Sequence, residues 1–215
     1  DTYSMALISC CSTSPLLSQD GRIYRTVPSD DLQGVALAQV ALERNAQRVS
    51  IIYLDDVYGN SLRENFLASY QGLAPGVQVH AVPYVAGAAS YTDVVQAAFR
   101  EQPDLLVLIA FPLAGAQIIK EWRESRLAPD VEWIGTDGLR DDTFVSIIGE
   151  EMPRFTGTAP AASSPYFEGF RQRYLAAVGG AEPGIFTSNQ YDAVVLIALA
   201  HSRAGPDLTV EEYRA

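Results

Sequence analysis

Apolar runs recur along the chain at a nearly constant spacing. Four β-prone runs begin near Val49, Val77, Leu105 and Val131, at intervals of 26 to 28 residues. Between them, apolar residues recur every three or four positions, which is the period of a helix. Strand–helix–strand units of this length are typical of crossovers between parallel strands. The pattern therefore predicts an α/β fold, with a doubly wound parallel sheet covered by helices on both faces.

Each helical segment is expected to bury one face against this sheet. In the segment before the first run, at about 31–45, that face carries Val35, Ala38 and Leu42. The next three segments have apolar faces made of Leu62, Phe66 and Tyr70; of Val94, Val95, Ala98 and Phe99; and of Ile118, Ile119 and Trp122. The motifs Ser61-x-x-Glu64 and Ser90-x-x-Asp93 are expected to be capping boxes that begin two of these helices.

The regular alternation stops at both ends of the chain. After a strand candidate, RFTGTAPA, residues 162–165 (ASSP) read as a crossing loop, followed by two amphipathic helical patterns. Residues 26–30 read as an earlier crossing. We therefore expect residues 30–160 to form one complete lobe, and 1–29 and 161–215 to be parts of a second, incomplete lobe. Because the chain opens on what reads as a core strand, we also expect an N-terminal portion to precede it.

Charge and composition narrow the classes of partner. The formal net charge is −11, which argues against nucleic acid and anionic membranes as partners. No apolar run approaches the length of a membrane span, so no insertion into a membrane is expected. The adjacent residues Cys10 and Cys11 are expected to be small buried apolar side chains, because a disulfide between sequence neighbours is strained. With only His80 and His201 besides, no metal site and no cofactor are expected.

Polar and aromatic residues follow the predicted strands, where ligands bind in open parallel sheets. Tyr58 follows the first strand, Phe111 the third and Asp137 the fourth. The crossing adds Asp30, and the loop near the N-terminus adds Ser12, Thr13 and Ser14. Hydroxyls, rings and carboxylates together suit a zwitterion or a small polar ligand with an apolar part.

Each of these candidates also has a purely structural interpretation. The pair Asp55-Asp56 can cap a turn, and Asp137-Gly138 is a common turn dipeptide. Phe111 can be a core residue, and residues 12–14 an ordinary loop. The case for a site is that the candidates gather at one edge of one sheet.

The sequence lacks the common motifs of catalysis, which argues against an enzyme. The sequence contains no phosphate-binding glycine loop, no dinucleotide fingerprint and no nucleophile elbow. Neither histidine is placed to activate a serine. We therefore expect no catalytic residues; a small metal-dependent enzyme using Asp55, Asp56 and Asp137 is the less favoured alternative.

Five stretches together resemble a known family: STSPLLSQDGRIYRTVPSDDLQG, RVSIIYLDDVYGNSLRENF, DLLVLIAFPLAGAQIIKEW, WIGTDGL and NQYDAVVLIALA. In order and spacing they are similar to the type I periplasmic solute-binding proteins. The branch they resemble is that of the leucine/isoleucine/valine receptors of ABC importers. The resemblance covers nearly the whole chain.

The resemblance implies a two-lobed receptor, periplasmic or extracellular, that closes over an amino acid in an interlobe cleft and delivers it to a membrane permease. It implies that Ser12, Thr13 and Ser14 contact the ligand carboxylate. It further implies that Asp137 and Asp30 serve the ammonium group, and that Tyr58 and Phe111 line the side-chain pocket. A ligand-sensing regulatory domain of the same fold is the alternative.

Overall fold

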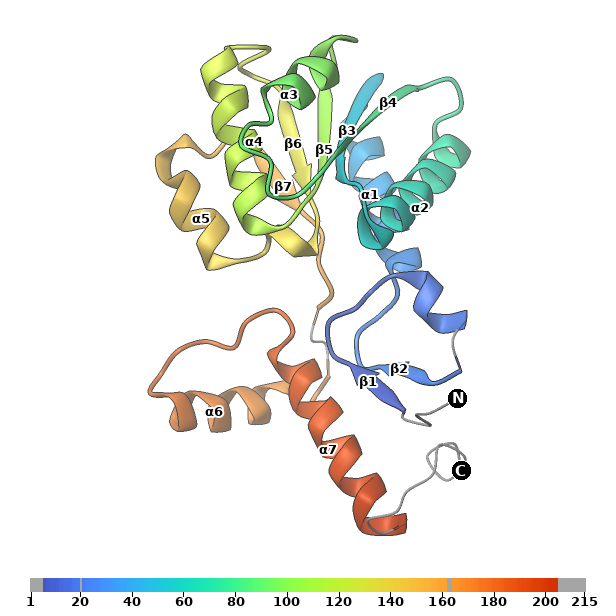
Figure 1. Ribbon diagram of the computed structural model, residues 1–215, viewed down its shortest axis with the longest axis vertical. Coiled ribbons are helices and arrows are strands. Elements are labelled where there is room, and N and C mark those ends of the chain that lie inside the picture. Colours follow the sequence, from blue (N-terminus) through green and yellow to red (C-terminus); the bar gives the residue numbers. More distant parts are fainter. Residues whose placement is uncertain (1–5, 20, 162–163, 205–215) are drawn as a thin grey trace. The chain divides into compact units, whose positions relative to one another are not determined.

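The computed structural model describes residues 6–19, 21–161 and 164–204 (Figure 1). The chain divides into two compact units. The central unit is residues 30–159; the flanking unit joins the described residues up to Ser29 with those from Pro160 onward. Positions 162–163 of the expected crossing loop lie outside the described residues, as do the first five residues of the chain.

The central unit is built on a five-stranded parallel sheet. Its strand order is β4-β3-β5-β6-β7, with Val49 of β3 paired to Val79 on one side and Leu105 on the other. The strands span Arg48–Leu54 (β3), Gln78–Tyr84 (β4), Leu105–Ile109 (β5), Glu132–Gly135 (β6) and Phe155–Gly157 (β7). All five residues of β5 are buried, as expected of a central parallel strand. The predicted doubly wound parallel sheet is confirmed.

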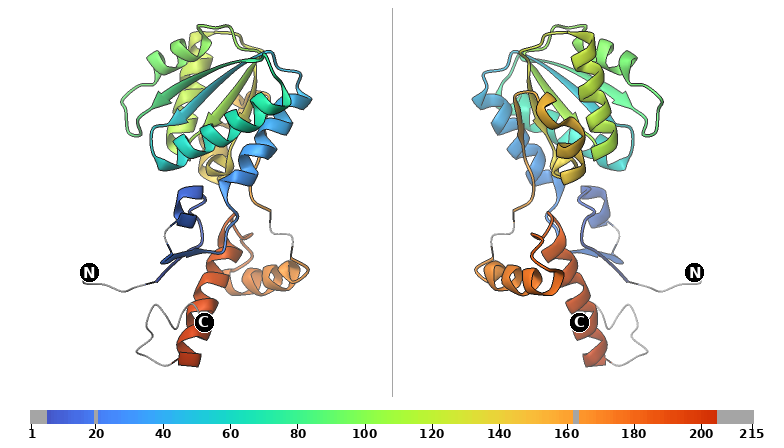
Figure 2. Two further views of the ribbon diagram at one scale, coloured as in Figure 1. Left: turned by 90° about the vertical axis from the view of Figure 1, so that its right-hand side faces the viewer. Right: turned by 90° about the vertical axis from the view of Figure 1, so that its left-hand side faces the viewer.

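Helices cover both faces of this sheet (Figures 1 and 2). Helices α1 (Asp30–Glu43) and α2 (Val57–Leu73) share one core cluster, in which Leu37 and Phe66 meet Ile51 of β3. Helices α3 (Thr92–Phe99), α4 (Pro112–Ser125) and α5 (Asp142–Ile148) share the other cluster, on the opposite face. Because side chains alternate along a strand, β3 sends Ile51 to the first cluster and Ile52 to the second.

The expected buried face of α1 is wrong at one of its three positions. Ala38 is buried and Leu42 packs, partly buried, against the core cluster, but Val35 is 52% exposed. The other buried side chains of the helix include Gln33, Leu37 and Ala41, beside Gly34. A Cβ atom at Gly34 would lie 2.6 Å from the Cβ of Asn65 in α2. The missing side chain at this position lets the two helices approach closely.

Both expected capping boxes are wrong. Ser61 lies inside α2, and the N-cap is Asp56, whose Oδ1 accepts a hydrogen bond from the Gly59 amide at 2.8 Å. Ahead of α3 the N-cap is Tyr91 and not Ser90, although Ser90 Oγ accepts from the Thr92 amide at 3.1 Å. The backbone amide of Tyr91 donates instead to a side chain of α4, the Glu121 carboxylate, at 2.7 Å.

The flanking unit has much less sheet. Strands β1 (Leu7–Ser9) and β2 (Ile23–Arg25) form a two-stranded parallel sheet, with the short 3-10 helix η1 (Pro15–Gln19) between them in sequence. The predicted helices are present as α6 (Phe167–Val178) and α7 (Thr187–Ala204). Thr26 Oγ1 donates to the Asn189 carbonyl at 2.8 Å, and this bond ties the chain after β2 to the start of α7.

Two further 3-10 helices belong to the central unit, η2 (Asp137–Leu139) and η3 (Gly149–Glu151). Of the helices in the described part of the chain, none is long and apolar enough to cross a membrane.

Candidate functional site

The strand order of the central unit places a topological switch point between β3 and β5, where successive crossovers leave in opposite directions. Ligands of open α/β sheets bind outside the carboxyl ends of the strands at such a point. Tyr58 follows β3 there, and Phe111 follows β5 as the N-cap residue of α4. Their rings stack with centroids 5.4 Å apart. Phe111 is 49% exposed, so it is not a core residue.

Tyr58 joins this aromatic pair to a carboxylate. Its hydroxyl donates to Asp137 Oδ1 at 2.8 Å and lies 2.9 Å from Thr136 Oγ1. Burial raises the pKa of Tyr58 well above its usual value, and the negative charge of Asp137 raises it further. Tyr58 therefore stays a neutral hydrogen-bond donor at all physiological pH values.

Asp137 is a buried acid, only 5% exposed, at the start of η2, two residues after the end of β6. Burial raises the pKa of Asp137, and hydrogen bonds from Tyr58, Gln33 and the Gly138 amide act in the opposite direction. These three donors are neutral groups. They orient the carboxylate without cancelling its charge, which leaves it suited to pair with a cationic group.

Asp30 is the first residue of α1 and is 1% exposed. Its charge contributes to the raised pKa of Tyr58. In the central unit Tyr58 thus contacts both Phe111 and Asp137, and Asp30 is close enough to act on Tyr58 electrostatically.

Sequence reasoning missed two members of this cluster, Gln33 and Thr136. Gln33 is 8% exposed, and its Nε2 donates to the Thr158 carbonyl at 3.1 Å. It lies three residues after Asp30, hence on the same face of α1, which is the signal that could have identified it. Thr136, 2% exposed, directly precedes Asp137 and contacts the same hydroxyl.

The structural interpretation of Asp55 and Asp56 holds. Asp56 caps α2, and Asp55 accepts a hydrogen bond from Asn60 Nδ2 at 3.0 Å. Within the described residues, no group of three or more His, Cys, Asp or Glu side chains is arranged to hold a metal ion.

The loop of residues 12–14 lies in the flanking unit, at the carboxyl end of β1. Ser9 Oγ accepts from the Ser12 amide at 3.0 Å, and Arg25 Nη1 donates to the carbonyls of Thr13 and Ser14 at 3.0 and 2.8 Å. Thr13 and Ser14 are buried, whereas Ser12 is exposed. The loop is therefore held from both ends by side chains of β1 and β2.

The prediction for the two cysteines is wrong. Cys10 and Cys11 form a disulfide with each other, and Cys11 is exposed, so they are not a pair of small core residues. Their Cα atoms are 3.8 Å apart, the spacing of any trans-linked neighbours. The chain bends at both residues as it leaves β1, and in this bend the two sulfur atoms bond.

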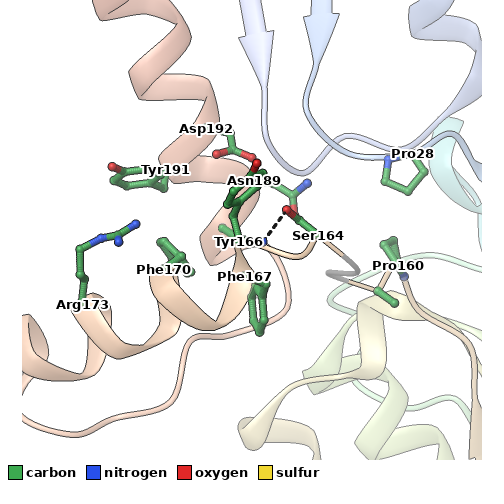
Figure 3. Close-up of a pocket in the computed structure, with 12 residues that line it drawn as sticks. Pro28, Pro160, Ser164, Tyr166, Phe167, Phe170, Arg173, Asn189, Tyr191 and Asp192 are labelled. Atoms are coloured by element: carbon green, nitrogen blue, oxygen red, sulfur yellow. Dashed lines mark hydrogen bonds between the residues drawn. The ribbon is translucent and has the colours of Figure 1, made fainter.

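A separate cavity of about 210 Å³ lies within the flanking unit, between α6 and α7 (Figure 3). Its aromatic lining includes Phe167, Phe170 and Tyr191, and the rings of the last two are 5.3 Å apart. Arg173 and Asp192 add charges of opposite sign. The sequence predicted two amphipathic helices in this part of the chain, but no cavity between them.

Comparison with known proteins places the chain in a family. Residues 1–211 match the receptor family ligand binding region. In a search of curated proteins, no sequence matches the chain.

Three solved structures illustrate the fold. A leucine-binding protein from Thermotoga maritima has a TM-score of 0.84 at 25% identity, over 97% of this chain and 61% of that one. A branched-chain amino acid transporter substrate-binding protein from Streptococcus pneumoniae, in complex with isoleucine, has a TM-score of 0.76 at 22% identity, over 97% of this chain and 60% of that one.

A solute-binding protein from Rhodopseudomonas palustris, in complex with 4-hydroxybenzoate, has a TM-score of 0.78 at 19% identity, over 97% of this chain and 58% of that one. The chain thus spans about three-fifths of the length of these structures, all three of which are named as binding proteins. The resemblance to the type I periplasmic binding proteins is confirmed, and the chain belongs to the receptor family ligand binding region.

Proposed function

We propose that this chain is part of an extracytoplasmic solute-binding receptor of an ABC importer, and that it binds an amino acid or a similar small ligand without catalysis. The observation that carries this proposal is the buried carboxylate of Asp137, held by neutral donors beside the stacked rings of Tyr58 and Phe111 at the switch point of the sheet.

The chemistry of this cluster defines the ligand class. A buried carboxylate with neutral donors pairs well with an ammonium group, because a charge-assisted hydrogen bond is about twice as strong as a neutral one. The half-exposed ring of Phe111 offers apolar surface to a side chain next to that ammonium. We propose that Asp137 and Asp30 serve the ammonium, and that Tyr58 and Phe111 line the side-chain pocket. For loop 12–14 we propose contacts with the carboxylate of the same class of ligand.

The proposed location and partner follow from the same family. A disulfide persists in oxidising compartments, so the Cys10–Cys11 bond supports a periplasmic or extracellular setting. In an importer of this family the partner that receives the ligand is a membrane permease. A DNA or RNA partner is not proposed, because the net charge of −11 would repel phosphate.

The test is a thermal-shift screen of the longest gene product that contains this chain, against the proteinogenic amino acids and 4-hydroxybenzoate. A ligand at 100 times its Kd adds about 2.7 kcal/mol to the free energy of unfolding, a shift that is easily measured. Stabilisation by aliphatic or aromatic amino acids is the expected result. If no amino acid stabilises the protein, the ligand class is wrong.

The role of Asp137 is tested by Asp137→Asn, which keeps an oxygen for Tyr58 but removes the charge. Losing a charge-assisted hydrogen bond of about 1.5–3 kcal/mol predicts binding weaker by about 10- to 100-fold in isothermal titration calorimetry. Because burial raises the pKa of Asp137, wild-type affinity should also fall as the pH decreases toward that raised pKa. The control is Asp130→Asn at an exposed position. Equal affinity in Asp137→Asn and wild type would contradict the assignment.

A further inference from the structure

The disulfide and the candidate loop are adjacent in the flanking unit. Cys10 and Cys11 directly follow β1, and the proposed ligand-contacting residues begin at Ser12. Ser9 Oγ accepts hydrogen bonds from both the Cys11 amide (3.3 Å) and the Ser12 amide (3.0 Å). The disulfide and the first residue of the loop therefore share one hydrogen-bond acceptor.

A disulfide between sequence neighbours closes a small ring that includes the peptide bond between them. The ring restricts the backbone torsions of both residues. Downstream, Arg25 fixes the carbonyls of Thr13 and Ser14. Ser12, the exposed residue of the loop, is thus joined on one side to a covalent ring and on the other to a segment held by an arginine.

We propose that the Cys10–Cys11 disulfide is a positioning element for the ligand-contacting loop 12–14, and that its reduction weakens ligand binding. This rests on the proposed function, because it assumes that the loop contacts the ligand. Ordering a loop in advance lowers the entropy that binding must otherwise overcome. Freeing the backbone of about one residue corresponds to binding weaker by roughly tenfold.

Reduction follows ordinary thiol–disulfide exchange. A thiolate of an added dithiol attacks one sulfur of the pair and forms a mixed disulfide, and the second thiol of the reagent then releases the protein. The protein gains two electrons and two protons and carries two thiols, while the dithiol becomes a cyclic disulfide. Cys11 is exposed and Cys10 is partly buried, so the bond lies in a part of the chain that a reductant can reach.

The experiment compares oxidised protein, dithiothreitol-reduced protein and the double variant Cys10→Ser, Cys11→Ser, all in the longest gene product containing this chain. Thiol titration and peptide mapping should show Cys10 and Cys11 without free thiols before reduction and with two free thiols afterwards. Isothermal titration with L-leucine or L-isoleucine should give about tenfold weaker binding for the reduced protein and for the double variant. Dithiothreitol should have no effect on the variant.

A readout that needs no ligand separates this proposal from the proposed function. Amide hydrogen exchange at Cys11 and Ser12 should become faster on reduction, while exchange in β5 of the central unit and the melting temperature of the ligand-free protein stay unchanged. Free thiols mapped to Cys10 and Cys11 in the untreated protein would overturn the proposal. So would amide exchange at Cys11 and Ser12 that stays the same on reduction, or an unchanged affinity for a ligand that binds. If neither L-leucine nor L-isoleucine binds but amide exchange at Cys11 and Ser12 becomes faster on reduction, the proposed ligand class is wrong. The proposal that the disulfide positions loop 12–14 then still holds.

Discussion

The two units contain similar amphipathic helices but bury very different numbers of their side chains. In the central unit, α2 buries Leu62, Phe66 and Tyr70 and α4 buries Ile118, Ile119 and Trp122. In the flanking unit, α6 buries no side chain, and over residues 187–203 of α7 only Ala193 is buried. A cavity of about 280 Å³ also remains beside β1, β2 and α7.

The difference comes from the amount of sheet that each unit offers. A five-stranded sheet has two broad faces, and each accepts a layer of helices. Two strands of three residues cannot cover an 18-residue helix, and small two-stranded sheets are marginal on their own. An amphipathic pattern therefore identifies the apolar face of a helix, but not whether other residues of the same chain cover that face.

The largest expected effect concerns the core of the central unit. Phe66→Ala removes a fully buried ring that stacks on Tyr70, and should lower the free energy of unfolding by about 3–5 kcal/mol. Both tryptophans, Trp122 and Trp133, belong to the central unit, so their fluorescence during urea denaturation reports its unfolding.

The matched control is Leu199→Ala in α7, where the side chain is 59% exposed and the cost should be below about 1 kcal/mol. If Phe66→Ala and Leu199→Ala lower the free energy of unfolding by similar amounts, the contrast in burial between the two units is wrong.

A smaller effect is expected where α1 meets α2. Gly→Ala inside a helix normally stabilises by up to about 1 kcal/mol. At Gly34 the added Cβ meets Asn65 at 2.6 Å, so we expect destabilisation by about 1–3 kcal/mol.

Gly72 of α2 is the control, because no heavy atom lies within 4 Å of a Cβ added there. Gly72→Ala should be neutral or stabilising in the same urea titration. A stabilising Gly34→Ala would show that the close approach of the two helices is not needed.

The smallest expected effect is the pH dependence that Asp137 gives to the central unit. Its pKa is raised by burial, so the folded state binds a proton more tightly than the unfolded state. The stability contributed by this group therefore falls as the pH rises from the ordinary aspartate range through the raised pKa. Asp137→Asn lacks this fall, so its stability relative to wild type should increase over that window and level off above it.

Urea titrations of both proteins across the acidic range measure this difference, with Asp130→Asn as the exposed control. A constant difference between Asp137→Asn and wild type at every pH would mean that the carboxylate is not protonated more readily in the folded protein.

Part of the candidate site could be predicted because it follows from strand ends. The carboxyl ends of parallel strands share one edge, so Tyr58, Phe111 and Asp137 could be placed together from their positions after three apolar runs. The position of Gln33 on the same face of α1 as Asp30 could also have been predicted. The hydrogen bonds from Tyr58 and Gln33 to Asp137 could not. Both depend on side-chain directions that the positions of strands and helices do not specify.

The sequence by itself determined the parallel sheet, the order of its helices and strands, and membership of the receptor family, because hydrophobic periodicity and motif spacing are local properties. The tertiary structure was needed to show that Val35 of α1 is exposed while Gly34 lies against α2, because the packing of one helix on another is not contained in the pattern of either. It also decided that Cys10 and Cys11 are bonded, because the bend after β1 brings their sulfurs together. Close approach between segments and local backbone bends depend on the whole fold, and a linear pattern of apolar and polar residues does not contain them.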